Sequence, residues 1–334
     1  MAVPPAAAAA AAAEVTETVA GKRGVDRLGV LDTVQRVAVV GGTHGNERTG
    51  VAFVQQLQRR KPSVSHKSTS SECTIQVAYV LGNPHATRAN RRYVDADLNR
   101  CFLTADLAAY TPTVGSSTTE VSRAYELNAL LGPKGCAVTD FILDCHTTTA
   151  NTGLSLMLAP DDKLALEVAA HLYSLDPSVR VVYWSDAADW PMLPSVGKSG
   201  MTVEVGPVSI GCISAAAYRL IQWAVDESIA YLHHRNTACA HSAVPQREVK
   251  CPVYRRVGTV DYPRSAGGQV DAMVHETLDG KDFEVVLTDT TPVFRTFRGE
   301  DVTFEDGAVR APVGTDDNLV PFFVNEASYY EKGV

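Results

Sequence analysis

Apolar and polar positions along the first two thirds of the chain change repeatedly between strand spacing and helix spacing. The apolar run Val37–Val40 ends at two glycines, and apolar residues then recur at helical spacing through Val51, Val54 and Leu57. This segment predicts a strand, a tight loop and a helix. The same pattern predicts further strands at 74–81, 141–144, 154–159, 179–184 and 201–205, and helices at 121–131, 161–173 and 213–234. The alternation predicts an α/β fold in which helices flank a sheet.

The texture changes from Val244 onward, where short β-type runs are separated by Gly, Pro and Asp. Strands are expected there at 249–260, 270–275, 283–287, 293–297 and 308–313. Near the beginning, two prolines precede eight alanines, Ala6–Ala13, and we expect a disordered extension. The predicted division is an Ala-rich extension over 1–33, a catalytic domain over 34–238 and a smaller β-rich domain over 239–334.

The composition argues against several classes of protein. The 334 residues are 45% hydrophobic and 20% charged, which is ordinary for a soluble globular chain. A net charge of −8 without a Lys/Arg-rich tract argues against nucleic acid or an anionic membrane as the main partner, and no run has the length of a transmembrane helix. Seven scattered cysteines without C-x-x-C spacing indicate neither a disulfide framework nor a cysteine zinc site. We therefore expect a reduced, cytoplasmic setting.

Candidate chemistry lies in the loop after the first strand, which carries His44 and Glu47. In open α/β sheets, ligands bind at the edge formed by the carboxyl ends of the strands. A second strand, 141–144, ends just before His146, and Asp144 could orient that imidazole. Imidazole nitrogens and carboxylate oxygens are good zinc ligands, so the pattern favours a zinc site with one open position. The alternative is that both histidines are satisfied within ordinary loops.

Two further segments carry charge in unusual places. Four arginines follow one expected strand, and the adjacent Asn99 and Arg100 could jointly bind one carboxylate. A solvated surface loop with local ion pairs is the alternative. Glu204 lies inside the apolar segment 201–205, where a carboxylate is unfavourable unless it is paired, protonated or functional. It is either a general base beside the metal or half of a buried salt bridge, with Lys198 as the candidate partner.

With these residues in view, the chain resembles the aspartoacylase/aminoacylase-3 family, a branch of the zinc carboxypeptidase-like hydrolases. The resemblance extends over about 37–332 and rests on five segments that occur in order. They read GGTHGNE, RYVDADLNR, DCHTTTANTG, VEVGP and NEASYYEK. The resemblance implies a zinc-carboxypeptidase-like mixed sheet flanked by helices. It also implies that the β-rich domain covers the cleft and restricts it to small substrates.

The resemblance assigns roles by position. Glu204 would be the general base and Arg92 would polarise the scissile carbonyl. The implied ligands of one zinc ion per chain are His44, Glu47 and His146. The implied substrate-binding residues are Asn99, Arg100 and Tyr329. The implied reaction hydrolyses a small N-acyl amino acid to the free amino acid and a carboxylate.

Departures from the aspartoacylase pattern concern specificity. Pro194 stands where aspartoacylases carry an arginine that pairs the aspartate side chain, Trp190 stands at a tyrosine position, and Thr147 replaces an asparagine. An acidic side chain would lose its water there without a partner, whereas an aromatic ring would gain burial. The implied substrates are therefore N-acyl aromatic or apolar amino acids, including S-substituted cysteines. If an acidic side chain is bound after all, Lys198 is the first candidate to supply the positive charge that Pro194 lacks.

Several alternatives stay open on the sequence. An aspartoacylase acting on N-acetyl-L-aspartate would share the whole site, and a metallocarboxypeptidase would share the ligand set but carry its glutamate base late in the chain. A nucleotide-binding module could use Gly41, Gly42 and Gly45, but their spacing does not fit G-x-G-x-x-G. A binding protein without activity is disfavoured because no motif position is lost. A homo-oligomer, either a dimer or a tetramer, is a further open alternative to a monomer.

Overall fold

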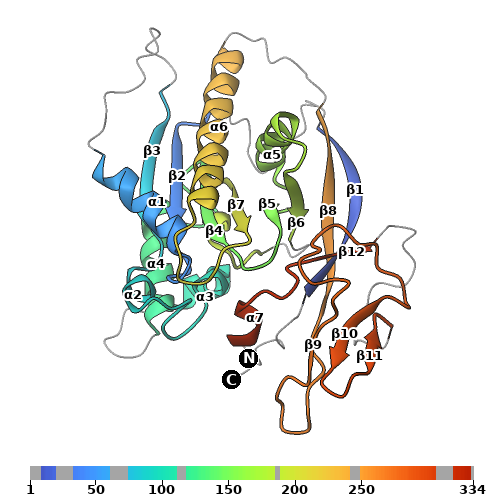
Figure 1. Ribbon diagram of the computed structural model, residues 1–334. Helices are drawn as coiled ribbons and strands as arrows, with labels where there is room; N and C mark the ends of the chain where they lie inside the picture. The colour runs from blue at the N-terminus through green and yellow to red at the C-terminus, as the bar shows by residue number, and fades with distance from the viewer. Residues whose placement is uncertain are drawn as a thin grey trace.

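The computed structural model describes residues 9–19, 33–60, 74–110, 118–184, 189–240, 249–305 and 319–331. Within these residues the centre is a nine-stranded mixed sheet in the order β12-β1-β8-β6-β5-β7-β4-β2-β3 (Figure 1). Its strands are β1 (Ala9–Val19), β2 (Arg36–Gly41), β3 (Gln76–Leu81), β4 (Phe141–Thr147), β5 (Gly153–Leu158), β6 (Arg180–Tyr183), β7 (Ser199–Gly206), β8 (Val249–Val260) and β12 (Leu319–Phe322). The predicted α/β fold is therefore confirmed.

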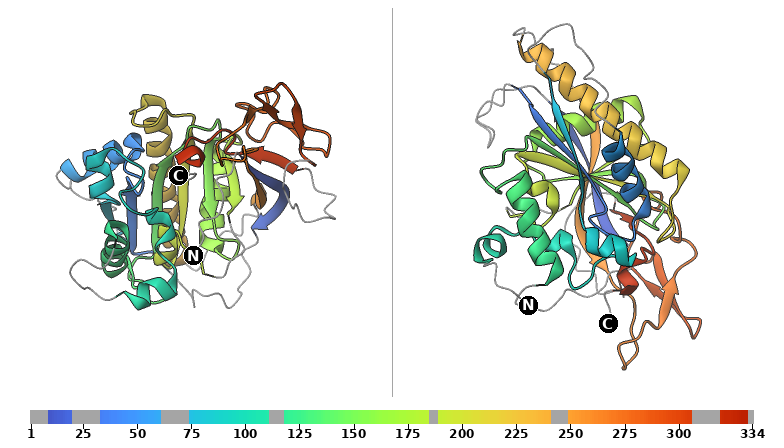
Figure 2. Two further views of the ribbon diagram at one scale, coloured as in Figure 1. Left: turned by 90° about the horizontal axis from the view of Figure 1, so that it is seen from below. Right: turned by 90° about the vertical axis from the view of Figure 1, so that its left-hand side faces the viewer.

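Helices cover both faces of this sheet (Figure 2). The longer helices are α1 (Arg48–Arg59), α4 (Thr119–Leu131), α5 (Lys163–Leu175) and α6 (Ala215–Ala240). Helices α1, α5 and α6 share one apolar core with the strands, and α4 packs in a second core on the opposite face. The connections contain α2 (Pro84–Ala89), α3 (Thr104–Ala109), α7 (Ser328–Glu331) and the 3-10 helices η1 (Leu98–Arg100) and η2 (Leu193–Val196).

The alternation of side chains explains why the strand at 36–41 reads as an unbroken apolar run. Val37 and Val39 face the core under α1, α5 and α6, whereas Ala38 and Val40 face the core under α4. A strand buried on both faces needs apolar residues at every position. Because β2, β3, β4 and β7 run parallel, their carboxyl ends lie at one edge of the sheet.

The C-terminal region divides between two sheets. Strands β8 and β12 extend the central sheet, while β9 (Ala272–Val274), β10 (Pro292–Thr296) and β11 (Asp301–Thr303) form a separate three-stranded sheet over its own apolar core. The predicted strand at 283–287 is wrong: the segment is a turn, and only Leu287 forms an isolated bridge. A β-type composition favours a strand but does not supply a partner strand. The strand expected at 308–313 lies outside the described residues.

The prediction of a disordered extension is wrong over Ala9–Val19. This segment forms β1, which lies between β8 and β12 and pairs with both in antiparallel register. Alanine has little preference for strands, so the run alone does not predict one. Strand β8 pairs with β1 along its whole length and β12 pairs with Ala10–Ala13, so backbone hydrogen bonds on both sides stabilise the alanine segment. The valines and threonines at the end of β1 are good strand residues. Residues 1–8 and 20–32 lie outside the described part.

Two further findings concern the setting of the chain. Cys101, Cys136, Cys145, Cys212 and Cys251 form no disulfide bond within the described part of the chain. Over the same residues, none of the helices combines the length and the apolar composition that a membrane span requires.

Candidate active site

Three neighbouring strands bring the predicted residues to one edge of the sheet. His44 follows β2, His146 lies near the end of β4, and Glu204 lies near the end of β7. The register places His146 beside Glu204 on adjacent parallel strands. The loop after β2 folds tightly because Gly45 has no side chain: a Cβ there would lie 2.1 Å from the backbone carbon of Ala86. The strand order and this glycine together place His44 opposite His146.

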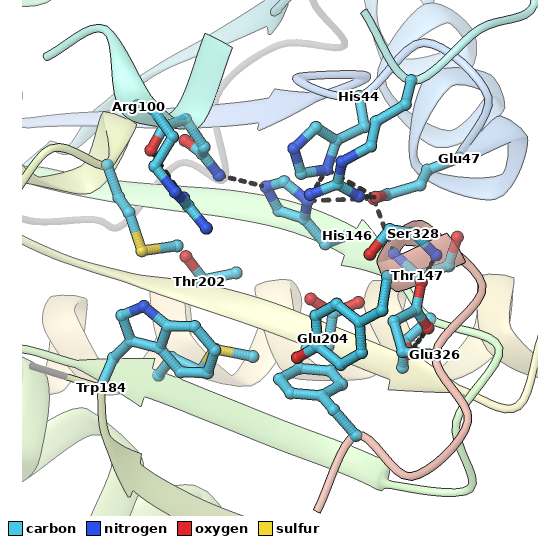
Figure 3. Close-up of a pocket in the computed structure, with 17 residues that line it drawn as sticks. His44, Glu47, Arg100, His146, Thr147, Trp184, Thr202, Glu204, Glu326 and Ser328 are labelled. Carbon is cyan, nitrogen blue, oxygen red and sulfur yellow. Dashed lines mark hydrogen bonds and ion pairs between the residues drawn. The ribbon is translucent and has the colours of Figure 1, made fainter. Parts of the chain in front are cut away.

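Two imidazoles and one carboxylate converge at this edge (Figure 3). The Nδ1 atom of His44 lies 2.6 Å from Glu47 Oε1, and the Nδ1 atom of His146 lies 2.9 Å from Glu47 Oε2. The two Nδ1 atoms are 3.1 Å apart. On the other side of each ring, His44 Nε2 lies 3.1 Å from Asp97 Oδ1, and His146 Nε2 lies 2.8 Å from Asp144 Oδ2.

These outer carboxylates determine which nitrogens are available. Asp97 and Asp144 favour a proton on each Nε2, so the two Nδ1 atoms, which face the Glu47 carboxylate, are the atoms that would coordinate a metal. Two imidazole nitrogens and a carboxylate, each ring oriented by a further carboxylate, fit a metal ion of the zinc type. The group His44, Glu47 and His146 could therefore hold a metal.

The charges of the cluster shift its pKa values. Burial would raise the pKa of Glu47, but positive charge on His44 and His146 outweighs burial and holds this pKa well below its usual range. Burial would lower the pKa of His146, but Asp144 and Glu47 hold it well above its usual range. The carboxylates thus supply negative charge that a divalent cation would balance.

Glu204 is a buried carboxyl at the same cavity. Its Oε1 atom has no hydrogen-bond partner among the residues that the structure describes. Burial raises the pKa of Glu204 well above its usual range, and the negative charge of Glu47 adds to the effect. The predicted alternative, a salt bridge with Lys198, is wrong, because Lys198 Nζ lies 2.6 Å from Asp140 Oδ1. A buried carboxyl that lines a cavity without a structural partner is typical of a group that transfers protons.

Arg92 is fixed beside the group His44, Glu47 and His146, which we call the metal-type cluster. Its Nη2 atom lies 3.2 Å from Asp97 Oδ2, and its Nη1 atom lies 3.6 Å from Glu47 Oε1. Only 12% of its side chain is exposed, so the alternative of a solvated surface loop is wrong for this arginine. The guanidinium is therefore available to bind a polar group that enters the cavity next to Glu47.

Asn99 and Arg100 lie in η1, on the same cavity wall. Arg100 donates from Nη1 to the carbonyl oxygen of Asn99 at 2.8 Å. The Asn99 amide is buried: its oxygen accepts from the backbone N–H of Leu193 at 3.1 Å, and its nitrogen lies 3.3 Å from His146 Nε2. Asn99 therefore also fixes the wall of the cavity. The Arg100 side chain also lines the cavity.

One cavity contains most of the predicted residues (Figure 3). From the predicted set it is lined by His44, Glu47, Arg92, Asn99, Arg100, His146, Thr147, Glu204 and Tyr329. It is also lined by Thr148, Met157, Trp184, Met192, Thr202, Phe323, Glu326 and Ser328. Three specificity candidates are outside this lining: Pro194 and Trp190 are buried in the neighbouring segment, and Lys198 pairs with Asp140.

Glu326 joins the C-terminal segment to the loop after β4, a role that the sequence did not indicate. Its Oε2 atom accepts a short hydrogen bond from the Thr148 hydroxyl, one from Thr149 N at 2.8 Å and one from Thr149 Oγ1 at 2.9 Å. Its Oε1 atom accepts from Ser328 N at 3.1 Å. Glu326 therefore fixes the position of Tyr329, which follows Ser328, against the cavity.

Glu120 is a second residue that the sequence did not indicate. Its side chain is fully buried at the start of α4, and Oε1 accepts from Asn83 Nδ2 at 2.9 Å and from Val94 N at 2.7 Å. Oε2 accepts from Asp95 N at 2.9 Å and Ala96 N at 3.1 Å. Glu120 thus fixes the backbone between the two residues, 92 and 97, that contact the metal-type cluster.

Glu120→Gln should reduce both stability and metal affinity. The amide nitrogen of glutamine would face backbone N–H groups, and a buried donor without an acceptor destabilises a fold by about 1–3 kcal/mol. Urea unfolding and zinc titration measure the two effects. The matched control is Glu126→Gln on the same helix, whose exposed side chain pairs with Arg123 at 2.7 Å; it should change stability by less than about 0.5 kcal/mol. Equal stability of the two variants would contradict the role of Glu120.

Comparison with known proteins identifies relatives over nearly the whole chain. Residues 33–231 match the succinylglutamate desuccinylase/aspartoacylase catalytic domain, and 249–334 match the AstE/AspA barrel-sandwich hybrid domain. A probable aspartoacylase of Nostoc sp. is 35% identical, covering 91% of this chain and 95% of the relative. An N-acyl-aromatic-L-amino acid amidohydrolase (carboxylate-forming) of Danio rerio is 38% identical, covering 91% of this chain and 88% of the relative. The crystal structure of murine aminoacylase 3 aligns with a TM-score of 0.74 and 32% identity, covering 90% of this chain and 93% of that chain.

The fold, the site and these relatives together define an amide hydrolase of the aminoacylase type. The resemblance inferred from the sequence motifs is confirmed. The chain belongs to the succinylglutamate desuccinylase/aspartoacylase family, which the two family models match over its catalytic and C-terminal regions.

Proposed function

We propose that the protein is a zinc-dependent hydrolase of N-acyl-L-amino acids that releases the free amino acid and a carboxylate. The observation that carries the proposal is the convergence of His44, Glu47 and His146 beside the buried carboxyl of Glu204. The names of the relatives, an aspartoacylase and an N-acyl-aromatic-L-amino acid amidohydrolase, support the substrate class. A zinc ion held by the three ligands would lower the pKa of a bound water towards neutrality.

Glu204 carries the proton in this proposal. Its carboxylate accepts a proton from the attacking water while the water oxygen bonds to the carbonyl carbon of the amide. The carboxyl then gives this proton to the amide nitrogen as the C–N bond breaks, so that the products are an amine and a carboxylate. A carboxyl whose pKa is raised by burial is suited to accept and return a proton.

Arg92 stabilises the charge that develops on the carbonyl oxygen. Its guanidinium is already oriented by Asp97 and lies beside Glu47, so little reorganisation is needed during the reaction. Arg100 and Tyr329 bind the α-carboxylate of the substrate, with Asn99 fixing the position of this wall. These contacts orient the amide with its carbonyl towards Arg92.

The remaining lining favours apolar side chains. Met157, Trp184, Met192 and Phe323 form apolar surface in the cavity. Aromatic rings gain burial and ring contacts there, and methionine side chains adapt to rings of different shape. We therefore propose that N-acyl aromatic and apolar amino acids, including S-substituted cysteines, are good substrates.

The direct test is a substrate panel with purified, zinc-loaded protein. We expect hydrolysis of N-acetyl-L-phenylalanine and N-acetyl-L-tyrosine, measured as free amino acid and acetate in equal amounts. A peptide with a free C-terminus should be a poor substrate, and preferential removal of its last residue would support the metallocarboxypeptidase alternative. If no N-acyl amino acid is hydrolysed, the proposal is wrong.

A further inference from the structure

The segment 323–329 forms the C-terminal wall of the cavity and has an unfavourable backbone conformation. The lining residues that it supplies are Phe323, Glu326, Ser328 and Tyr329. Phe323 and Asn325 have φ angles of 55° and 57°, in the left-handed region that residues other than glycine rarely adopt. Such a conformation persists only where surrounding contacts hold it. The contacts of this segment therefore determine where its lining side chains lie.

Asp282 binds this segment from a turn between β9 and β10. Its side chain is buried, and Oδ1 accepts from the backbone N–H of Val324 at 3.0 Å, between the two left-handed residues. The next residue, Phe283, donates its own N–H to the carbonyl oxygen of Pro321 at 2.8 Å. The turn therefore holds the chain on both sides of Phe323.

The second carboxylate oxygen of Asp282 binds the connection between β4 and β5. Oδ2 accepts from the backbone N–H of Asn151 at 3.1 Å, and Asn151 Nδ2 donates to the carbonyl oxygen of Gly280 at 2.8 Å. Thr148 in the same connection lines the cavity. Burial raises the pKa of Asp282 to about 6, while backbone N–H groups lower it. The carboxyl is therefore ionised at neutral pH, and it accepts charge-assisted hydrogen bonds from both segments.

We propose that Asp282 is a positioning residue for substrate binding: it joins the β4–β5 connection to the C-terminal wall and holds this wall in the conformation that contacts the substrate. The inference rests on the proposed function. Asp282 lies outside the lining of the cavity, so it acts through Phe323 and Tyr329. The metal-type cluster and Glu204 lie at the ends of β2, β4 and β7, whereas the hydrogen bonds of Asp282 go to the backbone of other segments. Substrate affinity should therefore depend on Asp282 more strongly than the chemical step does.

The test compares wild type with Asp282→Asn, using N-acetyl-L-phenylalanine at neutral pH. Asparagine keeps one acceptor oxygen but directs an NH2 group at a backbone N–H, so one of the two links is lost. KM should rise about ten- to a hundredfold, as expected for loss of a hydrogen bond to a charged group. Zinc content should not change, and kcat should stay within about twofold of wild type. A role in stability alone would lower the melting temperature and the active fraction but leave KM unchanged.

Asp289→Asn is the matched control, because it makes the same chemical change at an exposed position between β9 and β10 and should alter neither KM nor kcat. An unchanged KM in Asp282→Asn, or an equal rise of KM in both variants, overturns the inference. Should Asp282→Asn fail to fold, Asn151→Ala decides, because it removes the hydrogen bond to Gly280 from an exposed residue. Its KM should rise about two- to tenfold, the factor for a neutral hydrogen bond, and an unchanged KM contradicts the inference.

Hydrogen exchange tests Asp282 without an assay of turnover. Backbone amides of 323–329 should exchange faster in Asp282→Asn than in wild type, because loss of either link leaves the C-terminal wall less firmly held. Amides of β2, β4 and β7 should exchange at the wild-type rate. Equal exchange of 323–329 in the two proteins contradicts the role of Asp282. If wild type hydrolyses no N-acyl amino acid, the proposed function fails, and the exchange rates alone decide whether Asp282 holds the wall.

Discussion

Glu204→Gln should lower kcat for N-acetyl-L-phenylalanine by about 10²–10⁴-fold while leaving the zinc content unchanged. Glutamine has nearly the shape of glutamate but cannot accept and return a proton. Glu204 Oε1 has no hydrogen-bond partner in the described part of the chain, so the substitution removes no hydrogen bond from that atom. Steady-state kinetics and metal analysis on the same preparation measure both expectations.

The stability of this variant separates catalysis from a structural role. Burial raises the folded pKa of Glu204 above its ordinary value of 4.5, so folding takes up a proton at pH values between the two. The stability of metal-free wild type should therefore decrease as pH rises through that window, and Glu204→Gln should lack this contribution. At neutral pH the variant should melt no lower than wild type. A large loss of stability with near-normal turnover would show that Glu204 supports the fold.

A matched glutamate provides the control for this experiment. Glu276 is exposed on the C-terminal region, so Glu276→Gln makes the same chemical change away from the cavity. It should alter neither kcat nor the melting temperature. A similar loss of activity in both variants would mean that the effect on kcat does not come from the cavity.

The strand ends that carry the site could be predicted because two local signals agree. The run Val37–Val40 is apolar at every position, which is typical of a strand buried on both faces. The glycines that follow mark the end of the strand, and the carboxyl ends of parallel strands lie at one edge. His44 and His146 could therefore be expected close together, and Glu204 could be singled out by its position in an apolar strand.

Contacts between distant segments could not be predicted in this way. Asp97 contacts His44 across 53 positions, and the sequence placed it only among the charges around four arginines. Glu120 stood at the edge of a predicted helix, where a carboxylate is ordinarily exposed, but it is buried and accepts from Asn83 and from the backbone N–H groups of 94–96. The strands at 179–184 and 249–260 were both predicted, but their pairing in the sheet was not.

His146→Ala should remove most of the bound zinc and abolish turnover, because it deletes one of three ligands of the proposed site. Wild type should bind about one zinc ion per chain, and a chelator should inactivate it. A metal that binds only the folded state stabilises it by about 2.7–4.1 kcal/mol at a hundred to a thousand times Kd. Added zinc should therefore raise the melting temperature of wild type and of the control His85→Ala, which is exposed on α2, but not that of His146→Ala.

Asp144→Asn makes the same test more specific. Asp144 contacts His146 Nε2 at 2.8 Å and accepts from Thr43 Oγ1 at 2.7 Å, so asparagine can keep its orientation but loses the charge. Loss of such an outer carboxylate lowers metal affinity by about 10–100-fold while the three ligands remain. Excess zinc should then restore turnover in Asp144→Asn but not in His146→Ala. If His146→Ala retained stoichiometric zinc and normal turnover, His146 would not be a ligand, and the Asp144 contact would be explained as part of the buried core.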